Sequence, residues 1–140
     1  VTMADAKPVH EGGCLCGNIR YPFSGDPLAT AICHCKHCQR QGGSAFSIVS
    51  VVPSAAYAQK GDSKIYVDTG DSGQPVYRHF CGDCGSPIVS LVAAMPGVTI
   101  VKAGTLDDPS WLQPTQEVYC CNALPAVPHF AGTTRAQGAS

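Results

Sequence analysis

Seven of the nine cysteines in this 140-residue chain lie in three short clusters, a pattern that is typical of metal sites. The clusters are Cys14-Leu15-Cys16, Cys33-His34-Cys35-Lys36-His37-Cys38 and Cys81-Gly82-Asp83-Cys84. Seven clustered thiols are enough for one closed four-thiolate zinc site and for three ligands of a second site. Because the second site lacks a fourth protein ligand, a substrate can enter there. The cysteine count therefore points to chemistry as well as to stability.

The cluster at Cys81 and Cys84 gives the strongest zinc signal. A glycine follows each cysteine, which allows a tight knuckle whose backbone amides point at sulfur. A thioredoxin-like redox pair would need a helix that starts at Cys81, and the sequence Gly85-Ser86-Pro87 disfavours such a helix. Cys14 and Cys16 are flanked by glycines that let both sulfurs reach one ion. Pairing them with Cys81 and Cys84 would complete a four-sulfur site.

The middle cluster offers three thiols at positions i, i+2 and i+5, which can hold one ion and leave it one ligand short. Three thiolates outweigh the charge of Zn²⁺, so such a site favours exchange of an incoming thiolate over activation of water. The spacing also allows a different partition, in which Cys33 and Cys35 join Cys81 and Cys84 in the closed site. The residues alone leave both partitions open.

The residues beside the middle cluster have several candidate roles. His34 and His37 can be metal ligands, hydrogen-bond partners of the ligands or solvated side chains, and their spacing does not decide between these roles. Gln39 and Arg40 directly follow Cys38, so they can hold an anionic substrate near the metal. The alternative is that both belong to an exposed loop.

Composition limits the class of protein. A length of 140 residues without a linker-like segment predicts a single domain. A formal net charge of −1 and a pI near 6.5 argue against a nucleic-acid partner. No window approaches the ~20 apolar residues of a membrane span and the N-terminus shows no secretory signal, so we expect a soluble, cytoplasmic protein with no membrane partner. Nothing in the sequence indicates the oligomeric state.

The expected redox state follows from the compartment. In a reducing environment, closely spaced cysteines act as metal ligands or catalysts rather than as disulfides, and an odd total of nine prevents complete internal pairing. Cys120 and Cys121 are adjacent in a strand-like run, so their side chains point to opposite faces and at most one faces the core. We expect neither to bind a metal, since a free cysteine is often a small buried apolar residue.

The elements that must position these clusters are mostly strands. Tyr21 and Phe23 alternate with polar or small residues, as in a half-buried strand. Further β-rich runs are separated by Gly, Pro, Asp and Ser, at 46–52, 65–68, 76–80, 88–93, 98–103 and 117–121. Glycine-bearing turns at 69–73 and 95–97 predict two hairpins. Short helical turns are expected only after Cys38 and Ser54, so the sequence predicts a mainly β domain.

The three motifs, in this order and spacing, resemble the glutathione-dependent formaldehyde-activating enzyme family, which includes the domain of centromere protein V. The resemblance rests on Gly12-Gly13-Cys14-Leu15-Cys16-Gly17, Cys33-His34-Cys35-Lys36-His37-Cys38-Gln39-Arg40 with Gly43-Ser44-Ala45-Phe46, and Phe80-Cys81-Gly82-Asp83-Cys84-Gly85-Ser86-Pro87. It extends to about residue 130. We accordingly expect an N-terminal extension at 1–11, a zinc domain at 12–131 and a disordered tail at 132–140.

The resemblance implies a β-tent fold of coiled antiparallel sheets that zinc stabilises. Each chain would hold two Zn²⁺ ions. The family pattern gives a structural zinc to Cys14, Cys16, Cys81 and Cys84, and a catalytic zinc to Cys33, Cys35 and Cys38. The loop after the middle cluster would then position the substrate, through Gln39, Arg40, Gly43, Ser44 and Phe46.

The activity that the resemblance implies is that of a zinc-dependent carbon–sulfur lyase. Such an enzyme makes or breaks thiol adducts such as S-hydroxymethylglutathione, which forms from formaldehyde and glutathione. Its partner would be a small-molecule thiol or thiol adduct, glutathione among them. Two alternatives stand beside it, a lyase acting on a different thioether or thiol adduct, and a non-catalytic zinc-stabilised binding module. Two zinc ions, one of them readily released by a chelator, would favour the enzyme.

Overall fold

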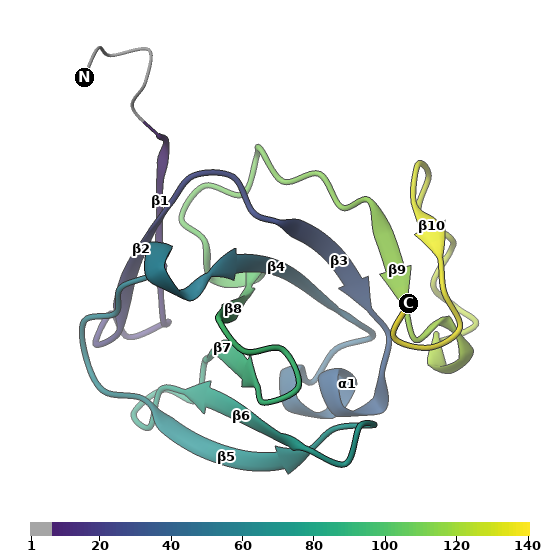
Figure 1. The fold of residues 1–140 in the computed structure, drawn as a ribbon, viewed down its shortest axis with the longest axis horizontal. Helices are drawn as coiled ribbons and strands as arrows, with labels where there is room; N and C mark the ends of the chain where they lie inside the picture. Colours follow the sequence, from purple (N-terminus) through teal and green to yellow (C-terminus); the bar gives the residue numbers. More distant parts are fainter. Residues whose placement is uncertain (1–6) are drawn as a thin grey trace.

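The computed structural model describes residues 7–140, and their regular structure is mostly β-strand, as predicted (Figure 1). The strands are β1 Val9–Gly13, β2 Arg20–Ser24, β3 Ala29–Cys33, β4 Ser47–Pro53, β5 Lys64–Thr69, β6 Pro75–Phe80, β7 Pro87–Val92, β8 Val98–Lys102, β9 Gln116–Val118 and β10 Thr134–Arg135. The helical elements are α1 Lys36–Gly42 and the 3₁₀ turns η2 Ser54–Ala56, η3 Ala103–Thr105 and η4 Cys120–Asn122. Within residues 7–140, none of the helices has the length and apolar character that crossing a membrane requires.

The strands form two sheets. β1 and β2 make a small antiparallel pair, and the other eight follow the order β10-β9-β3-β4-β8-β7-β6-β5. In Figure 1 the large sheet coils from β9 and β3 through β4, β8 and β7 to β6 and β5. The pairings among the other strands are antiparallel, as predicted, whereas β9 runs parallel to both β3 and β10. A parallel pair needs a long crossover, and more than 80 residues of chain separate β3 from β9.

Both predicted hairpins are confirmed. β5 pairs with β6 and β7 pairs with β8, each antiparallel. Gly73 adopts φ 82° in the first connection and Gly97 adopts φ 83° in the second. Glycine populates this left-handed region without the steric cost that a Cβ atom imposes, so these residues permit the tight returns.

Helix α1 begins earlier than the sequence predicts. It starts at Lys36 rather than after Cys38, because the Cys35 side chain caps its first turn by accepting a hydrogen bond from the Cys38 N–H at 3.2 Å. Gly43 ends the helix in the left-handed conformation with φ 62°. The second predicted turn, after the strand β4, is confirmed as η2.

The core seals the small sheet against the large one. Tyr21 and Phe23 on β2 are almost completely buried, as the alternating pattern predicts. The Tyr21 hydroxyl shares a hydrogen bond with Thr105 Oγ1 at 2.7 Å, which satisfies the polar end of a buried ring. The other fully buried apolar side chains of this core are Ile19, Val52, Cys81, Ile88 and Val101. The packing holds the β1–β2 connection in a fixed place beside the sheet.

Three segments differ from the sequence prediction. The run 29–33 was not expected as a strand, yet it forms β3, with four of its five residues buried. The predicted strand at 117–121 ends at Val118, because Tyr119 takes φ 55° and ψ 40° and the chain then turns into η4. Within the predicted disordered tail, Thr134 and Arg135 pair with β9. Residues 1–6 of the predicted extension lie outside the described residues, and 9–11 belong to β1.

Candidate metal centres and the adjoining pocket

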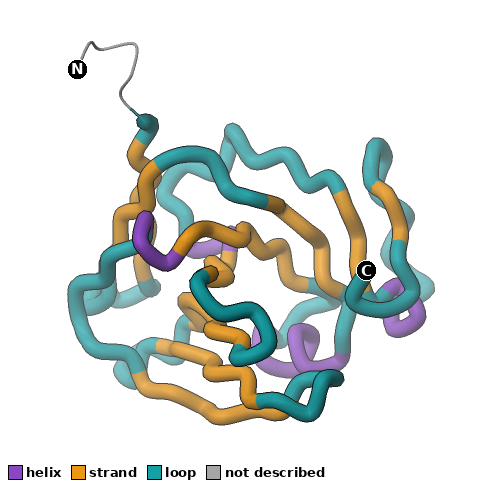
Figure 2. Tube along the Cα trace, in the orientation of Figure 1, coloured by secondary structure: helices purple, strands orange, loops and turns teal. Residues whose placement is uncertain are grey.

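The structure brings the first and third cysteine clusters together. Cys14 and Cys16 lie in the β1–β2 connection, and Cys81 and Cys84 lie in the β6–β7 connection, both of which Figure 2 shows as loops. Ligand atoms from all four residues lie within 4.8 Å of one another. The alternative partition, which puts Cys33 and Cys35 with Cys81 and Cys84, is not the grouping that the structure forms.

The sulfur spacing of this four-cysteine cluster fits a tetrahedral metal. Cys14 Sγ lies 3.6 Å from Cys16 Sγ, and Cys16 Sγ lies 3.7 Å from Cys81 Sγ. Zn–S bonds of about 2.3 Å place the sulfurs of a tetrahedron about 3.8 Å apart. The backbone N–H of Ile19 also donates to Cys14 Sγ at 3.2 Å, as expected beside a thiolate. The four residues can therefore hold a zinc ion.

The β6–β7 connection has the backbone of a knuckle. The Cys81 N–H donates to the Ser86 carbonyl at 2.9 Å, and the Gly85 N–H donates to the Cys81 carbonyl at 2.8 Å. Gly85 has φ 81°, so the glycine after the second cysteine is needed for the turn. Hydrogen bonds from the Ser86 side chain and backbone lower the pKa of Cys84 to about 5. This loop favours the thiolate form that a metal requires.

The middle cluster stays separate and is one ligand short. Cys33 ends β3, Cys35 precedes α1 and Cys38 lies within α1. Their sulfurs lie within 4.8 Å of one another, and no other Cys, His, Asp or Glu among residues 7–140 joins the group. Cys33 and Cys38 are buried, whereas Cys35 is partly exposed. The three-cysteine cluster can hold a metal and has one side toward solvent.

Two buried cations stand beside the three-cysteine cluster. Hydrogen bonds from the thiols of Cys33 and Cys35 lower the pKa of Cys38 to about 2, and the charges of Lys102 and Arg78 act in the same direction. Both cationic residues are more than nine-tenths buried. Burial lowers the pKa of Lys102, and the neighbouring thiolates oppose that effect. Three thiolates around Zn²⁺ leave one negative charge, which these cations can offset.

The residue between two of these cysteines is tied to the far end of the chain. His34 is buried, and its Nε2 lies 2.9 Å from Glu117 Oε1. Glu117 Oε2 accepts hydrogen bonds from Thr133 Oγ1 at 2.7 Å and from Arg135 Nη1 at 3.0 Å. Cys120 lies close enough to make a third candidate metal group, but the Glu117 carboxylate is already neutralised. This internal network of hydrogen bonds and ion pairs fixes residues 33–38, which we call the cluster loop.

Gln39 and Phe46, both predicted to contact substrate, have structural contacts of their own. The Gln39 amide nitrogen donates to the carbonyls of His34 at 2.7 Å and of Asn122 at 2.9 Å. It thus ties the start of α1 to η4. The Phe46 ring packs edge-on against His34 and Phe130, with centroid distances of 5.9 Å and 5.3 Å. These contacts form one wall beside the cluster loop.

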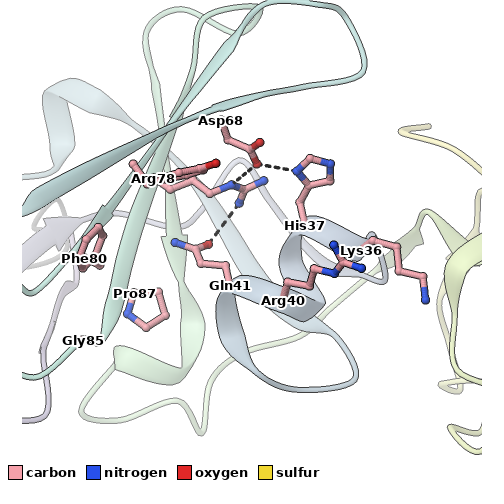
Figure 3. Close-up of a pocket in the computed structure, with 10 residues that line it drawn as sticks. Lys36, His37, Arg40, Gln41, Asp68, Arg78, Phe80, Gly85 and Pro87 are labelled. Atoms are coloured by element: carbon pink, nitrogen blue, oxygen red, sulfur yellow. Dashed lines mark hydrogen bonds and ion pairs between the residues drawn. The ribbon is translucent and has the colours of Figure 1, made fainter.

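A cavity of about 600 Å³ lies between α1 and the β5–β6 hairpin (Figure 3). Of the remaining predicted substrate residues, Arg40 lines this cavity, whereas Gly43 and Ser44 are exposed just beyond the end of the helix. We call it the α1–β6 pocket. Its lining is Lys36, His37, Arg40, Gln41, Tyr66, Asp68, Arg78, Phe80, Gly85 and Pro87.

One carboxylate organises the inner wall of the pocket. Asp68 Oδ2 accepts hydrogen bonds from His37 Nδ1 at 2.6 Å and from Arg78 Nε at 2.8 Å (Figure 3). Burial raises the pKa of Asp68, but the hydrogen bonds from His37 and Arg78 outweigh that effect and lower it to about 2. Arg78 Nη1 donates in addition to Gln41 Oε1 at 3.2 Å. The network joins α1 to the hairpin through charged side chains.

Tyr119 stands beside the three-cysteine cluster in a strained conformation. It follows Val118, the β-sheet partner of Cys33, and is the one non-glycine residue of the described chain with positive φ. Burial raises its pKa to about 12, and the charges of Asp71, Cys33 and Cys35 add to the shift. No sequence signal marks a tyrosine for this conformation, so sequence reasoning missed it.

Lys102 and Arg78 were also missed, although a signal exists for both. Lys102 ends the strand Val98–Lys102, which is apolar apart from Thr99, and Arg78 precedes His79 among the apolar and aromatic residues of Pro75–Phe80. A charged side chain in such a strand is buried only when a partner compensates it. The partners are on other elements, so the sequence marks the residues without identifying their role.

Comparisons with known proteins agree with this geometry. A family model described as "Glutathione-dependent formaldehyde-activating enzyme" matches residues 9–122. A protein of Emericella nidulans is 30% identical over 89 residues, which cover 59% of this chain and 44% of that protein. A protein of Aspergillus flavus is 27% identical over 127 residues, which cover 81% of this chain and 62% of that protein. The names of both relatives assign them provisionally to the same enzyme class, and the chain spans about half their length.

A solved structure shares the fold. The crystal structure of a Rhodobacter sphaeroides protein superposes with a TM-score of 0.55 at 18% sequence identity, covering 74% of this chain and 91% of that one. At this identity the likeness concerns the fold alone. The family model spans most of the chain and includes all three cysteine clusters. The chain therefore belongs to the glutathione-dependent formaldehyde-activating enzyme family.

Proposed function

We propose that this protein is a zinc-dependent carbon–sulfur lyase that makes or breaks thiol adducts such as S-hydroxymethylglutathione. The structural zinc would be held by Cys14, Cys16, Cys81 and Cys84, and the catalytic zinc by Cys33, Cys35 and Cys38. The observation that carries the proposal is the difference between the two clusters. One is complete with four thiols, whereas the other combines three thiols, a partly exposed side and two buried cations.

The three-cysteine cluster suits the binding of a thiol. A zinc ion held by Cys33, Cys35 and Cys38 would favour an incoming thiolate over activation of water, because three thiolates outweigh its charge. An added thiolate brings one more negative charge to the cluster. Lys102 on β8 and Arg78 on β6 supply the compensating positive charge. Cys35, the partly exposed member, marks the side from which the thiol enters.

The reaction needs no redox partner. In the forward direction the thiol sulfur forms a bond to the carbonyl carbon of formaldehyde, the carbonyl π electrons move to oxygen, and the proton of the thiol ends on that oxygen. The reverse direction breaks the same carbon–sulfur bond. Phe46 and Phe130 form an apolar wall beside the cluster loop, which limits access of water. Holding the sulfur and the carbon in reach of each other supplies much of the acceleration.

The substrate we propose is an acidic thiol such as glutathione, and Arg40 would contact its carboxylates. Gln39, Gly43, Ser44 and Phe46 would shape the adjoining loop. The family membership and the names of the relatives support glutathione. The working compartment we propose is the reducing cytoplasm, because all nine cysteines are free thiols.

Replacing Cys35 with serine tests the catalytic assignment. We expect Cys35→Ser to lower turnover of S-hydroxymethylglutathione by at least about a thousandfold, because a metal ligand and the entry side of the cluster are both changed. Zinc content measured by mass spectrometry should fall from two ions to one per chain. The melting temperature of the variant should equal that of the parent. Cys121→Ser removes an exposed cysteine outside both clusters and serves as the matched control.

The substrate assignment needs a panel rather than one compound. Thiol–aldehyde adducts and thioethers should be screened against the zinc-loaded protein, with glutathione adducts expected to react fastest. Turnover of a different thioether alone would assign the site to another carbon–sulfur lyase. Full activity of Cys35→Ser with both zinc ions retained would sink the catalytic assignment. A single tightly bound zinc and no turnover with any member would make the protein a binding module.

A further inference from the structure

The α1–β6 pocket concentrates positive charge in a chain whose overall charge is negative. Three of the nine Lys and Arg residues line it, namely Lys36, Arg40 and Arg78, against the single carboxylate of Asp68. The formal net charge of the whole chain is −1. A concave site lined by charges of one sign focuses the electrostatic potential and attracts ligands of the opposite sign. The cysteines of both clusters are absent from its lining.

Arg78 is held in place before any ligand arrives. Its side chain is about nine-tenths buried, its Nε donates to Asp68, and its Nη1 donates to Gln41 (Figure 3). An arginine carries five N–H donors, and within residues 7–140 these two side chains are the partners that its guanidinium finds. The remaining donors form a rigid fork, and such a fork matches the two oxygens of a carboxylate or phosphate.

The two cations of α1 line the same cavity, and neither has an acidic partner among residues 7–140. Lys36 and Arg40 are four residues apart, so they lie on one side of the helix. Like charges at this spacing repel each other, and α1 contains no acidic residue to separate them. Among the described residues neither side chain forms an ion pair. A bound anion would remove this repulsion and pair with both groups.

The walls and the size of the pocket indicate an organic ligand. Tyr66, Phe80 and Pro87 supply apolar surface beside the cations. A volume of about 600 Å³ lies within the range of small-molecule sites and is far larger than an inorganic ion needs. With two positive charges in excess, the best-matched ligand carries two negative charges on an apolar body.

We propose that the α1–β6 pocket binds an organic dianion, a dicarboxylate or a phosphate monoester, between the Arg78 fork and the paired cations Lys36 and Arg40. The pocket shares Arg40 with the substrate contact proposed above, but binding of the dianion requires no metal and no turnover, so its titration is a test separate from that of the carbon–sulfur chemistry. Because α1 also carries Cys38, a ligand in the pocket contacts the helix that positions one cysteine of the open cluster.

Calorimetric titration of the zinc-loaded full chain tests the proposal at low ionic strength. The probes are phthalate for a dicarboxylate, phenyl phosphate for a phosphate monoester and benzamide as a neutral ring of similar size. We expect at least one dianion to bind and benzamide not to bind. The stronger of the two dianions identifies the acidic group that the fork prefers. Raising the salt concentration to 0.5 M should weaken binding, since partly exposed charges are screened.

Two variants separate a built site from general electrostatic attraction. The double variant Lys36→Ala/Arg40→Ala should weaken binding of the dianion at least about tenfold, because two charge-assisted contacts to it are lost. Lys7→Ala/Lys60→Ala removes the same charge from exposed positions outside the pocket and should leave the affinity unchanged. Arg78→Lys keeps the charge but loses the fork, so binding should also weaken, with thermal melting to confirm that this variant folds.

Three outcomes would overturn the proposal. They are no binding of either dianion at 10 mM, equal binding of benzamide, and equal losses of affinity in the two double variants. The titration is made without a lyase substrate and reports binding to the pocket alone. Failure of the protein to turn over any thiol adduct or thioether would therefore count against the proposed function and not against this proposal.

Discussion

The two cysteine clusters use the same ligand atom and differ in almost everything around it. The four-cysteine cluster joins two strand connections, and cysteines 65 residues apart in sequence, Cys16 and Cys81, lie 3.7 Å from each other. Its sulfurs are satisfied locally, by one another and by the hydroxyl of Ser86. The three-cysteine cluster comes from one short segment at the junction of β3 and α1.

The difference teaches that position in the chain and surrounding charge separate a fold-holding site from a reactive one. A metal in the first cluster closes a loop of the chain, so its binding energy becomes folding energy. A metal in the second closes only a six-residue segment and adds little to the fold. Instead, that cluster has Lys102 and Arg78 nearby, whose positive charges favour its thiolates and can also compensate an added anion.

The strongest test of this comparison is to remove one thiol from the four-cysteine cluster. We expect Cys81→Ser to unfold the domain at room temperature, because structural zinc sites contribute roughly 10 kcal/mol or more of folding free energy. Circular dichroism and urea titration measure the loss, with Cys121→Ser as control. Cys35→Ser should keep its fold under the same conditions. Equal melting temperatures for the Cys81 and Cys35 variants would remove the distinction between the clusters.

The next largest effect is expected on zinc affinity when a positive charge beside the three-cysteine cluster is removed. We expect Lys102→Met to weaken zinc at the three-cysteine cluster roughly tenfold, as loss of groups that support metal ligands commonly does. Zinc at the four-cysteine cluster should keep its affinity, because Lys102 contributes no charge to those thiols. Competition with a chromogenic chelator measures both sites in one titration. Lys60→Met is the surface control, and an equal change at both clusters would contradict the expectation.

A smaller effect is expected from the network behind His34. Glu117→Gln removes the buried charge that pairs with Arg135 and His34, and we expect it to lower the free energy of unfolding by about 2 kcal/mol. Urea denaturation of the zinc-loaded protein gives the value. Glu11→Gln changes an exposed carboxylate and should have no measurable effect. A stability equal to that of the parent would mean that the cluster loop is held by Gln39 and Phe46 alone.

The smallest expected effect is the loss at low pH of the stability that Asp68 contributes through its contacts with His37 and Arg78. Its pKa is about 2 in the folded protein and 3.8 ordinarily, so its contribution to stability is complete above about pH 4 and is lost as the pH falls toward 2. The difference in unfolding free energy between the parent and Asp68→Asn should therefore shrink across that interval. Zinc release affects both proteins equally and cancels in the difference. A constant difference from pH 5 to pH 2 would exclude this role.

The parts of the molecule whose backbone is determined by short local patterns could be predicted from the sequence. The knuckle at Cys81 and Cys84 follows from glycines that permit its turn, and the two hairpins follow from Gly73 and Gly97. The grouping of seven thiols into four and three did not follow from spacing, and only the family resemblance selected it. The metal ligands and their catalytic role stay a prediction until zinc is measured.

The parts that could not be predicted depend on distant contacts. The strand β3 was not predicted because its run is short and, apart from Thr30, has no polar residue that would give the alternation of a half-buried strand. Lys102 and Tyr119 became visible as parts of the site only when β8 and β9 were placed next to β4 and β3. The tail at 132–140 was expected to be disordered, yet Arg135 donates a hydrogen bond to the buried carboxylate of Glu117.

The strand β10 has a consequence for anyone who transplants or fuses this domain. The N–H groups of Tyr119 and Cys120 donate to the carbonyls of Gly138 and Ala136, so the chain behind the open cluster is completed by its last few residues. An expression boundary set at residue 131 would strip away Arg135 and leave Glu117 charged and half-paired in the interior. A portable version of the domain should end no earlier than Gly138, and affinity tags belong beyond that point.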